Sequence, residues 1–498
     1  MADLASDPTT VDLFALAPEL SVIVAALLIL LVELALTGER KRAVNLIGLA
    51  GVAVALAFTV ALWADIGDGA RAAFGNAFVV DQYALLFKSL FLSVALFVLL
   101  LSYRYLSEFR TYQGEYYVLL LGSFVGMLLM VSARDLVMLF VALELVSIPG
   151  FVMAGLRKFD LRSNEGSLKF FVMGVLSATI LLFGMSVVYG VTGTTDLAGI
   201  AVALETTERL PLLLAAVLFV IVGFGFKVSA VPFHFWAPDT YQGSPVPVAA
   251  FLSVASKAAG FAGLLQVTFV AFAPLAEVWA PVLGVLAILT MSLGNLLALQ
   301  QTNIVRLLAY SSIAHAGYML VPFGVASAAD AALNRDAFRA VLIYLIAYAV
   351  MNSGAFAAVT AVTRSQSSRL VADYAGLGRR SPGLAAALSI FLLSLGGVPP
   401  LVGIWAKFFV FSVAVEAGTG FGLVLAAAVI LNTVVAMFYY LAVVRTMWMD
   451  APTVEAPVAP GKALGFAVGG LAVLTVALFL GVGVFTDVAG VSTLVAAG

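Results

Sequence analysis

Long apolar runs separated by short polar stretches dominate this chain of 498 residues. The hydrocarbon core of a bilayer is roughly 30 Å thick, and a helix needs about 20 apolar residues to cross it. Fourteen runs reach this length, so we predict an all-α integral membrane protein with about 14 transmembrane helices. The predicted spans lie near residues 17–36, 43–64, 82–103, 115–133, 135–155, 167–192, 210–235, 245–270, 274–299, 302–323, 338–362, 382–413, 421–446 and 463–486.

The boundary between the fourth and fifth spans is the least obvious one. A single helix over residues 115–155 would be about 60 Å long, which is twice the thickness of the bilayer core. We therefore expect the chain to turn at Arg134-Asp135. We also expect the first apolar run to stay as a span, because residues 1–19 carry acidic residues and lack the positive region of a signal peptide.

The charges of the predicted loops indicate the orientation. With fourteen spans, alternate loops lie on opposite sides of the membrane, and most loop Lys and Arg residues fall on one side. The other side receives Arg71, Arg134, Arg209, Arg335 and Arg339. Because cytoplasmic loops carry the excess of positive charge, we expect both termini on the non-cytoplasmic side.

The composition supports a membrane protein and excludes several kinds of site. The chain is 63% hydrophobic and 10% charged, and its mean hydropathy is +1.12. The absence of cysteine excludes disulfides, iron–sulfur ligation and thiol catalysis by this chain. The chain has only two histidines, so we do not expect a His-rich metal or haem site. No nucleotide-binding glycine motif, metal-ligand spacing or long basic run occurs, so we expect no nucleic-acid partner.

Five lysines fall within or at the edges of the predicted spans: Lys88, Lys169, Lys227, Lys257 and Lys407. A charge at the bilayer centre costs about 2.5–3.5 kcal/mol, so each lysine must reach the headgroups, find a partner or face water. Lys88 lies near a span end, and we expect it to extend to the headgroups. Lys169 fits either interpretation. Lys227, Lys257 and Lys407 lie deeper, among small residues that pack against other helices, and we expect them to be functional.

Two of these lysines accompany helix breakers. GFGFKVSAVPFHFWAPD, from Gly223, combines Lys227 with Pro232, and SLGGVPPLVGIWAKFFVF, from Ser394, combines Lys407 with glycines and prolines. A broken helix frees backbone polar groups, which a membrane tolerates where they line a cavity. The predicted interruptions lie in helices 7 and 12, five spans apart, which favours two inverted five-helix repeats over spans 4–8 and 9–13. We divide the single membrane domain into residues 1–114 (three N-terminal helices), 115–270 (first repeat), 271–449 (second repeat) and 450–498 (C-terminal helix).

Further polar residues extend this set into a candidate path. Glu144 is the clearest buried carboxylate in the pattern, and we expect it to form a pair with Lys227 whose strength changes during function. His315 shares a helix face with Ser311 and Tyr318, and we expect it to act as a proton relay. Ser253 and Lys257 share another face. For Tyr344, Tyr348 and Asn352 we favour interhelical hydrogen bonds. The predicted line along the membrane plane is Glu144, Lys227, Lys257, His315 and Lys407.

Several stretches resemble a known family. The chain resembles the antiporter-like subunits of respiratory complex I, and among them the N subunits of bacterial NADH-quinone oxidoreductase. The resemblance rests on FVALELVSIP, LRSNEGSLKFF, KVSAVPFHFWAPDTYQGSPVPVAAFLSVASKAAGF, RLLAYSSIAHAGYML and GGVPPLVGIWAKFF, which lie between residues 140 and 409. Lysine at position 407, where M subunits usually carry glutamate, and the short segment after the last span both favour the N subunit over the M and L subunits.

The resemblance implies a fourteen-helix fold with inverted repeats and a role in proton translocation driven by quinone reduction in other subunits. It assigns proton transfer to Glu144, Lys227, Lys257 and Lys407, and relay or modulation to Lys169 and His315. No cofactor is expected in this chain; NADH, FMN, iron–sulfur clusters and quinone are expected in partner subunits. The expected partners are the M subunit and small K and J subunits in the bacterial cytoplasmic (inner) membrane. An Mrp-type sodium/proton antiporter subunit and a purely structural membrane scaffold are the alternatives.

Overall fold

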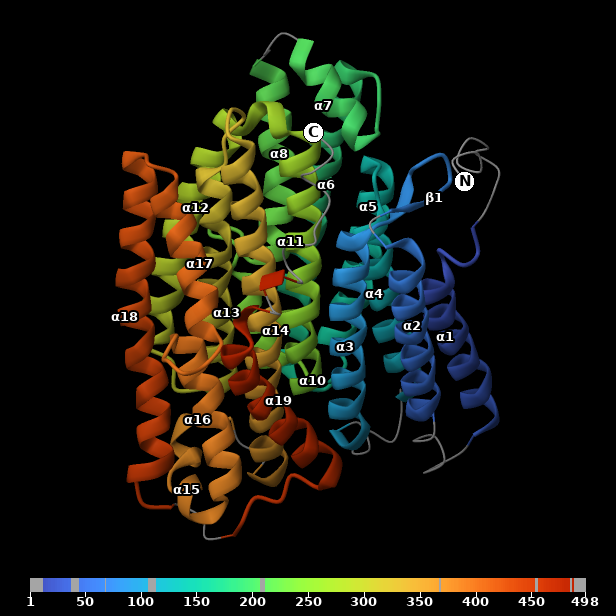
Figure 1. The fold of residues 1–498 in the computed structure, drawn as a ribbon. Coiled ribbons are helices and arrows are strands. Elements are labelled where there is room, and N and C mark those ends of the chain that lie inside the picture. The colour runs from blue at the N-terminus through green and yellow to red at the C-terminus, as the bar shows by residue number, and fades with distance from the viewer. Residues whose placement is uncertain are drawn as a thin grey trace.

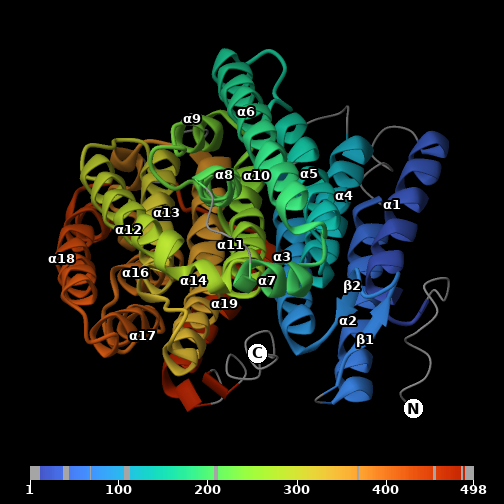
Figure 2. The same cartoon turned by 90° about the horizontal axis from the view of Figure 1, so that it is seen from above.

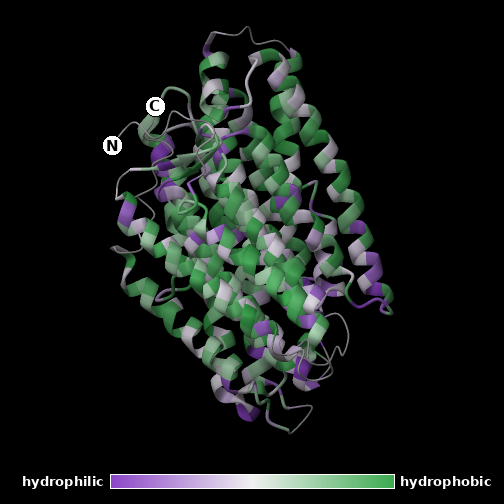
Figure 3. Cartoon of the chain, turned by 90° about the vertical axis from the view of Figure 1, so that its right-hand side faces the viewer, coloured by the Kyte–Doolittle hydropathy of each residue, from purple (hydrophilic) through white to green (hydrophobic). Residues whose placement is uncertain are grey.

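Helices standing side by side along one axis build almost the whole molecule in the computed structural model (Figure 1). The structure describes residues 12–36, 44–67, 69–105, 113–206, 211–366, 369–452, 456–483 and 486–487. Arg209, one of the residues used to predict the orientation, lies outside this part of the chain. Hydrophobic residues cover the middle of the bundle, and hydrophilic residues gather toward its two ends (Figure 3). This distribution is that of a protein that crosses a bilayer.

Three helices and a small hairpin form the N-terminal part. These elements are α1 (Ala17–Ala35), α2 (Val44–Ile66), β1 (Arg71–Ala73), β2 (Phe78–Val80) and α3 (Gln82–Tyr105). The two strands pair antiparallel, with Arg71 opposite Val80. The hairpin was not predicted, because three-residue strands leave too short a pattern to detect in sequence.

The next elements surround the first helix break. They are α4 (Gln113–Ser132), α5 (Leu136–Ala154), α6 (Leu161–Thr192), α7 (Leu197–Thr206), α8 (Pro211–Val228), α9 (Trp236–Gly243), α10 (Val246–Phe251), the π-helix η3 (Leu252–Ser256), α11 (Lys257–Gln266) and the π-helix η4 (Val267–Ala271). The predicted turn at Arg134-Asp135 is confirmed, because the Asp135 side chain accepts hydrogen bonds from the backbone of Val137 and Met138 and so caps α5. The short helix α7 was not predicted.

The second half of the chain contains longer helices. It comprises the 3₁₀ turn η5 (Ala273–Leu275), α12 (Ala276–Ala298), α13 (Ile304–Leu320), η6 (Pro322–Val325), α14 (Ala331–Gln366), η7 (Val371–Tyr374), α15 (Leu377–Arg380), α16 (Pro382–Gly396), α17 (Gly403–Glu416), α18 (Gly420–Met449) and α19 (Lys462–Leu480). In the described part of the chain, thirteen helices are long and apolar enough to cross a membrane. The pair α16 and α17 occupies the remaining predicted span.

Both predicted interruptions are present. The seventh span was predicted over residues 210–235, but α8 ends at Val228, and residues 229–235 are not helical. The proline ring of Pro232 would collide with the carbonyl of Val228 in a continuous helix. The twelfth span divides at Gly397, whose φ of 90° lies in the left-handed region.

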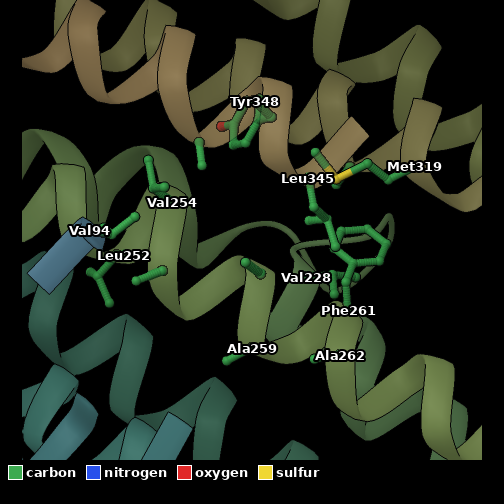
Figure 4. Packing of buried hydrophobic residues seen from close by; sticks show 14 of the residues in the cluster. Val94, Val228, Leu252, Val254, Ala259, Phe261, Ala262, Met319, Leu345 and Tyr348 are labelled. Atoms are coloured by element: carbon green, nitrogen blue, oxygen red, sulfur yellow. The ribbon is translucent and has the colours of Figure 1, made fainter. Parts of the chain in front are cut away.

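The most buried helices lie in the middle of the bundle. Seen from above, α1 and α18 mark opposite edges, and α11 and α14 lie between them (Figure 2). Almost every residue from Val246 to Ala271 is buried. Figure 4 shows the packing there, where Phe261 lies beside Val228 and Leu345 of neighbouring helices. A lysine on these helices therefore has protein, not lipid, around it.

Candidate functional site

Lys227 lies at the end of α8, directly before the helix break. Its side chain is buried, and Nζ donates a hydrogen bond of 3.0 Å to Oγ of Ser147 on α5. The stem of Lys227 passes α11 at Gly260, where an added Cβ would lie only 2.8 Å from Cγ of the lysine. Ser229 follows with a φ of 62°, an unusual backbone conformation for a residue other than glycine. The break and the glycine together give Lys227 room between α5 and α11.

Glu144 differs from the sequence prediction. It is only half-buried, whereas Glu19 and Glu33 are buried. The reason is that Glu144 shares the outward face of α5 with the exposed residues Val141 and Ile148. Hydropathy could not reveal this, because the lipid-facing and protein-facing sides of a membrane helix are both apolar.

The predicted pair of Glu144 with Lys227 is not a direct ion pair. Among the described residues, no carboxylate lies within 4.0 Å of Lys227 Nζ. Glu144 lies one turn before Ser147, the residue that Lys227 contacts, and an electrostatic interaction links the two charged groups. The sequence analysis missed Ser147. Its spacing of three residues from Glu144 could have shown that the two side chains lie close together on one helix.

Lys257 is the first residue of α11, after a π-helical turn. It is buried, and its Nζ donates a hydrogen bond of 2.7 Å to the backbone oxygen of Ser312 on α13. Ser253, predicted to share its face, bonds instead with Tyr348 and Asn352 on α14. The intervening π-helical turn therefore directs the two side chains to different neighbours, and such turns often occur at functional sites.

His315 lies between two tyrosines. Its Nδ1 is 2.8 Å from the hydroxyl of Tyr344 on α14, and its Nε2 is 3.2 Å from the hydroxyl of Tyr440 on α18. Tyr440 also contacts Ser311 at 2.5 Å. The interhelical hydrogen bond predicted for Tyr344 is thus confirmed, but the hydroxyls that contact His315 come from Tyr344 and Tyr440 and not from Ser311 and Tyr318, with which it was predicted to share a face. Tyr440 was missed because it comes from a helix distant in sequence, and nothing in the pattern predicts that contact.

Lys407 crosses the second helix break. Its Nζ donates a hydrogen bond of 2.8 Å to the carbonyl of Gly396, at the end of α16. The same Nζ lies 4.9 Å from the ring centroid of Tyr318 on α13, a cation–π geometry. A Cβ at Gly397 would lie 3.0 Å from Cδ of Lys407, so glycine at this position lets the lysine reach the freed carbonyl.

The helix α13 brings these groups together. Ser312, His315 and Tyr318 follow each other at three-residue spacing, so they lie along one side of the helix. Lys257 reaches the first of them and Lys407 the third, with His315 between. Electrostatic interactions link His315 to both lysines. The structure therefore places Lys257, His315 and Lys407 around one helix and Lys227 beside Gly260, one turn from Lys257.

Lys169 lies in another environment. Its Nζ contacts Oε1 of Glu165 at 2.5 Å and Oδ2 of Asp239 at 2.6 Å, and its side chain is partly exposed. Oδ1 of Asp239, on α9, also forms an ion pair with Nη1 of Arg306 at 2.5 Å. Asp239 lies outside the membrane-spanning helices. Burial raises the pKa of its carboxyl, but the hydrogen bonds from Lys169 and Arg306 outweigh this effect and hold the pKa below its usual range. Lys169 thus fixes the short helix after the break and has no direct contact with Glu144.

Asp239 is a functional candidate that the sequence reasoning missed. The end of α9 is held further by Arg157, which donates to the carbonyl of Gly243 at 2.7 Å, and by Arg369, which donates to the carbonyl of Gln242 at 2.6 Å. The segment WAPDTYQGSP contributes these acceptors, and its unusual polarity in an apolar chain was the available signal.

The prediction for Lys88 is wrong. Its side chain does not extend to the headgroups but is completely buried, with Nζ 2.7 Å from Oε1 of Glu19 on α1. The partner of this ammonium is a carboxylate on α1, almost 70 residues earlier in the chain, which the local pattern around residue 88 could not show.

Comparison with known proteins places this arrangement in a family. Residues 133–433 match the family described as NADH:quinone oxidoreductase/Mrp antiporter, TM. NADH-quinone oxidoreductase subunit N of Dehalococcoides mccartyi is 40% identical over 475 residues, which cover 93% of this chain and 95% of that protein. Subunit N 2 of Streptomyces griseus is 43% identical, and the match covers 88% of this chain and 83% of that protein.

Solved structures show the same fold. A chain of respiratory complex I from Thermus thermophilus with bound aureothin has a TM-score of 0.78 and 32% identity, with 95% of this chain and 99% of that chain covered. A chain of the Mrp complex from Dietzia sp. has a TM-score of 0.84 at 21% identity, with 98% and 97% covered, and this likeness shows the fold alone. From its match to the family over residues 133–433 and its identity with these relatives, the chain belongs to the subunit N family of NADH-quinone oxidoreductases.

Proposed function

We propose that this chain translocates protons across the membrane along Glu144, Lys227, Lys257, His315 and Lys407, coupled to quinone reduction in other subunits of NADH-quinone oxidoreductase. One observation carries the proposal. Lys257 and Lys407 contact the same helix on either side of His315, and neither ammonium has a carboxylate within 4.0 Å among the described residues. Buried lysines without counter-charges stabilise a membrane protein poorly, so a functional role explains them better.

The proposed path begins at the first helix break. Among the described residues, the ammonium of Lys227 has the hydroxyl of Ser147 as its hydrogen-bond partner, and Glu144 lies one turn before Ser147 on α5, where its charge acts on the proton of Lys227. When Glu144 moves away or is neutralised, Lys227 gives its proton to the neutral amine of Lys257. The reverse change prepares Lys227 to take up a new proton. The flexible stem beside Gly260 permits this exchange.

The second part of the path crosses α13. Lys257 passes its proton through His315, whose two ring nitrogens face hydroxyl groups and can accept a proton on one side and release one on the other. Lys407 receives the proton and releases it at the second break toward the non-cytoplasmic side. The proposal includes water molecules that bridge the gaps between these side chains and carry the proton across them.

Several features accompany the proposal. Spans 4–8 and 9–13 form the two inverted repeats, each with one broken helix and one lysine at the break, within the domain boundaries given above. Lys169 modulates the path through Asp239 and the end of α9. The complex lies in the bacterial cytoplasmic membrane with both termini of this chain outside the cytoplasm. M, K and J subunits are its membrane neighbours, and NADH, FMN, iron–sulfur clusters and quinone bind in other partner subunits.

The test begins with the chain isolated from its native membranes in mild detergent and assayed for NADH-dependent quinone reduction. We expect this activity to copurify in fixed ratio. Sodium/proton exchange without such activity would instead support an Mrp-type antiporter. The Lys227→Ala variant then separates a proton path from a structural scaffold: we expect assembly and electron transfer to persist while proton translocation is lost. Lys462→Ala, at the exposed start of α19, is the matched control.

A further inference from the structure

The N-terminal three helices hold a buried ion pair that the lysine path does not use. Glu19 lies in the first turn of α1, and Lys88 lies in the second turn of α3. Their side chains are 2% and 0% exposed, and Nζ lies 2.7 Å from Oε1. Among the described residues, neither oxygen of the Glu19 carboxylate nor the ammonium of Lys88 has a well-directed hydrogen-bond partner.

Stability alone does not explain this pair. Removing two charges from water costs several kcal/mol per ion, and apolar residues of similar volume often stabilise a protein as well or better. Hydrogen bonds that would offset this cost are lacking around Glu19 in the described part of the chain. Such incompletely satisfied ionisable groups within a membrane protein indicate a functional site.

Charged and polar groups lie between the pair and the helix that carries Lys257. Lys88 interacts electrostatically with Asp81 and Arg134. Arg134 contacts Asp81 at 2.6 Å and donates to Oε1 of Gln266 at 2.7 Å. Gln266 is the last residue of α11, whose first residue is Lys257. Gln266 and Lys257 lie at opposite ends of α11, so a change of charge at the pair acts on Lys257 through the electric field across this helix.

The hairpin separates the pair from water at this end of the bundle. Phe78 of β2 places its ring 4.9 Å from Nζ of Lys88. Arg71 of β1 holds the hairpin by ion pairs with Asp12 at 2.7 Å and Asp65 at 2.8 Å, and all three side chains are partly exposed. The pair thus lies beside a hairpin whose charged residues are partly exposed at this end of the bundle.

We propose that the Glu19–Lys88 pair is a second protonation site, which binds a proton when Lys257 releases one and releases it when Lys257 is protonated. A proton from water adds to the carboxylate of Glu19, so the pair changes from zero net charge to plus one, and release to water reverses the step. The proposal rests on the proton path described above. At an effective dielectric constant of about 20 and a separation on the order of 20 Å, one unit charge shifts an equilibrium about fourfold.

The test uses the intact complex in vesicles, with NADH-driven proton translocation and electron transfer measured together. The double variant Glu19→Gln/Lys88→Met removes both charges and leaves no buried charge unpaired. We expect it to assemble and transfer electrons in uncoupled vesicles, while the rate of proton translocation falls about fourfold. Glu19→Gln/Lys88→Gln, which keeps a polar pair unable to bind a proton, should show the same loss.

Four outcomes overturn the proposal or separate it from the proposed function. Wild-type proton translocation in the assembled double variants would make the pair structural, and so would failure of both to assemble. Lys257→Met is measured in parallel. If it abolishes translocation while the double variants translocate normally, only the second protonation site fails; if Lys257→Met translocates normally, the lysine path itself fails.

Discussion

Gly260 offers a steric test of the position of Lys227. In Gly260→Ala, the new Cβ would lie 2.8 Å from Cγ and 3.1 Å from Cβ of Lys227. Carbon atoms pack best at about 3.5–4.0 Å, so the lysine stem must move by about 1 Å. Alanine favours a helix over glycine by about 1 kcal/mol, which offsets part of an overpacking cost of about 1–3 kcal/mol. We therefore expect the complex to assemble with nearly wild-type stability.

The expected functional loss is much larger than the loss of stability. A misplacement of about 1 Å at a reacting group can slow a reaction about 100-fold. We expect proton translocation in vesicles to fall by about this factor, while NADH oxidation in uncoupled vesicles persists. Gly263→Ala is the matched control, because its Cβ meets Phe224 on the same pair of helices but no lysine. Wild-type translocation in Gly260→Ala, or an equal loss in Gly263→Ala, would refute the reasoning.

Three further predictions concern other parts of the site. His315→Gln removes the titrating ring between the two tyrosines and should slow proton translocation about 100-fold or more with assembly intact; a wild-type rate of vesicle acidification would exclude a relay. Gly397→Ala places a side chain at φ 90° and against Lys407, so we expect about 1–2 kcal/mol of destabilisation, seen as a lower Tm, together with lost translocation; an unchanged Tm would contradict the strain. The pKa of Asp239 is lowered in the folded chain, so its ion pairs stabilise the protein above the unfolded value of 3.8 and this stabilisation is lost as the pH falls through the lower folded pKa. Asp239→Asn should therefore lower the Tm at neutral pH, by an amount that shrinks in acid; a pH-independent difference would show that charge is not the cause.

Much of the architecture follows from run length alone. An apolar run near 20 residues specifies a span, and the prolines and glycines beside Lys227 and Lys407 specify where two spans break. The structure confirms both breaks. The hairpin and α7 escaped prediction because they are short and lie outside the spans.

The site was harder to predict than the spans because lipid and protein interior are equally apolar. Sequence placed Lys257, His315 and Lys407 inside, but it could not show that Glu144 faces outward or that Lys88 finds Glu19. Contacts between distant helices, such as that of Tyr440 with His315, depend on tertiary packing that no local period records.

The most direct measurement of the central claim is proton translocation by the complex that carries Lys257→Met. Methionine has a similar volume and no charge, and it replaces an ammonium that has a backbone carbonyl as its partner. Because the change removes a buried charge, we expect thermal unfolding at or above the wild-type temperature. The account predicts that this complex is stable and transfers electrons but does not acidify the vesicle interior. The background for this measurement is the Lys462→Ala complex in vesicles treated with an uncoupler. Acidification at the wild-type rate would contradict the claim that protons pass through the lysines around α13.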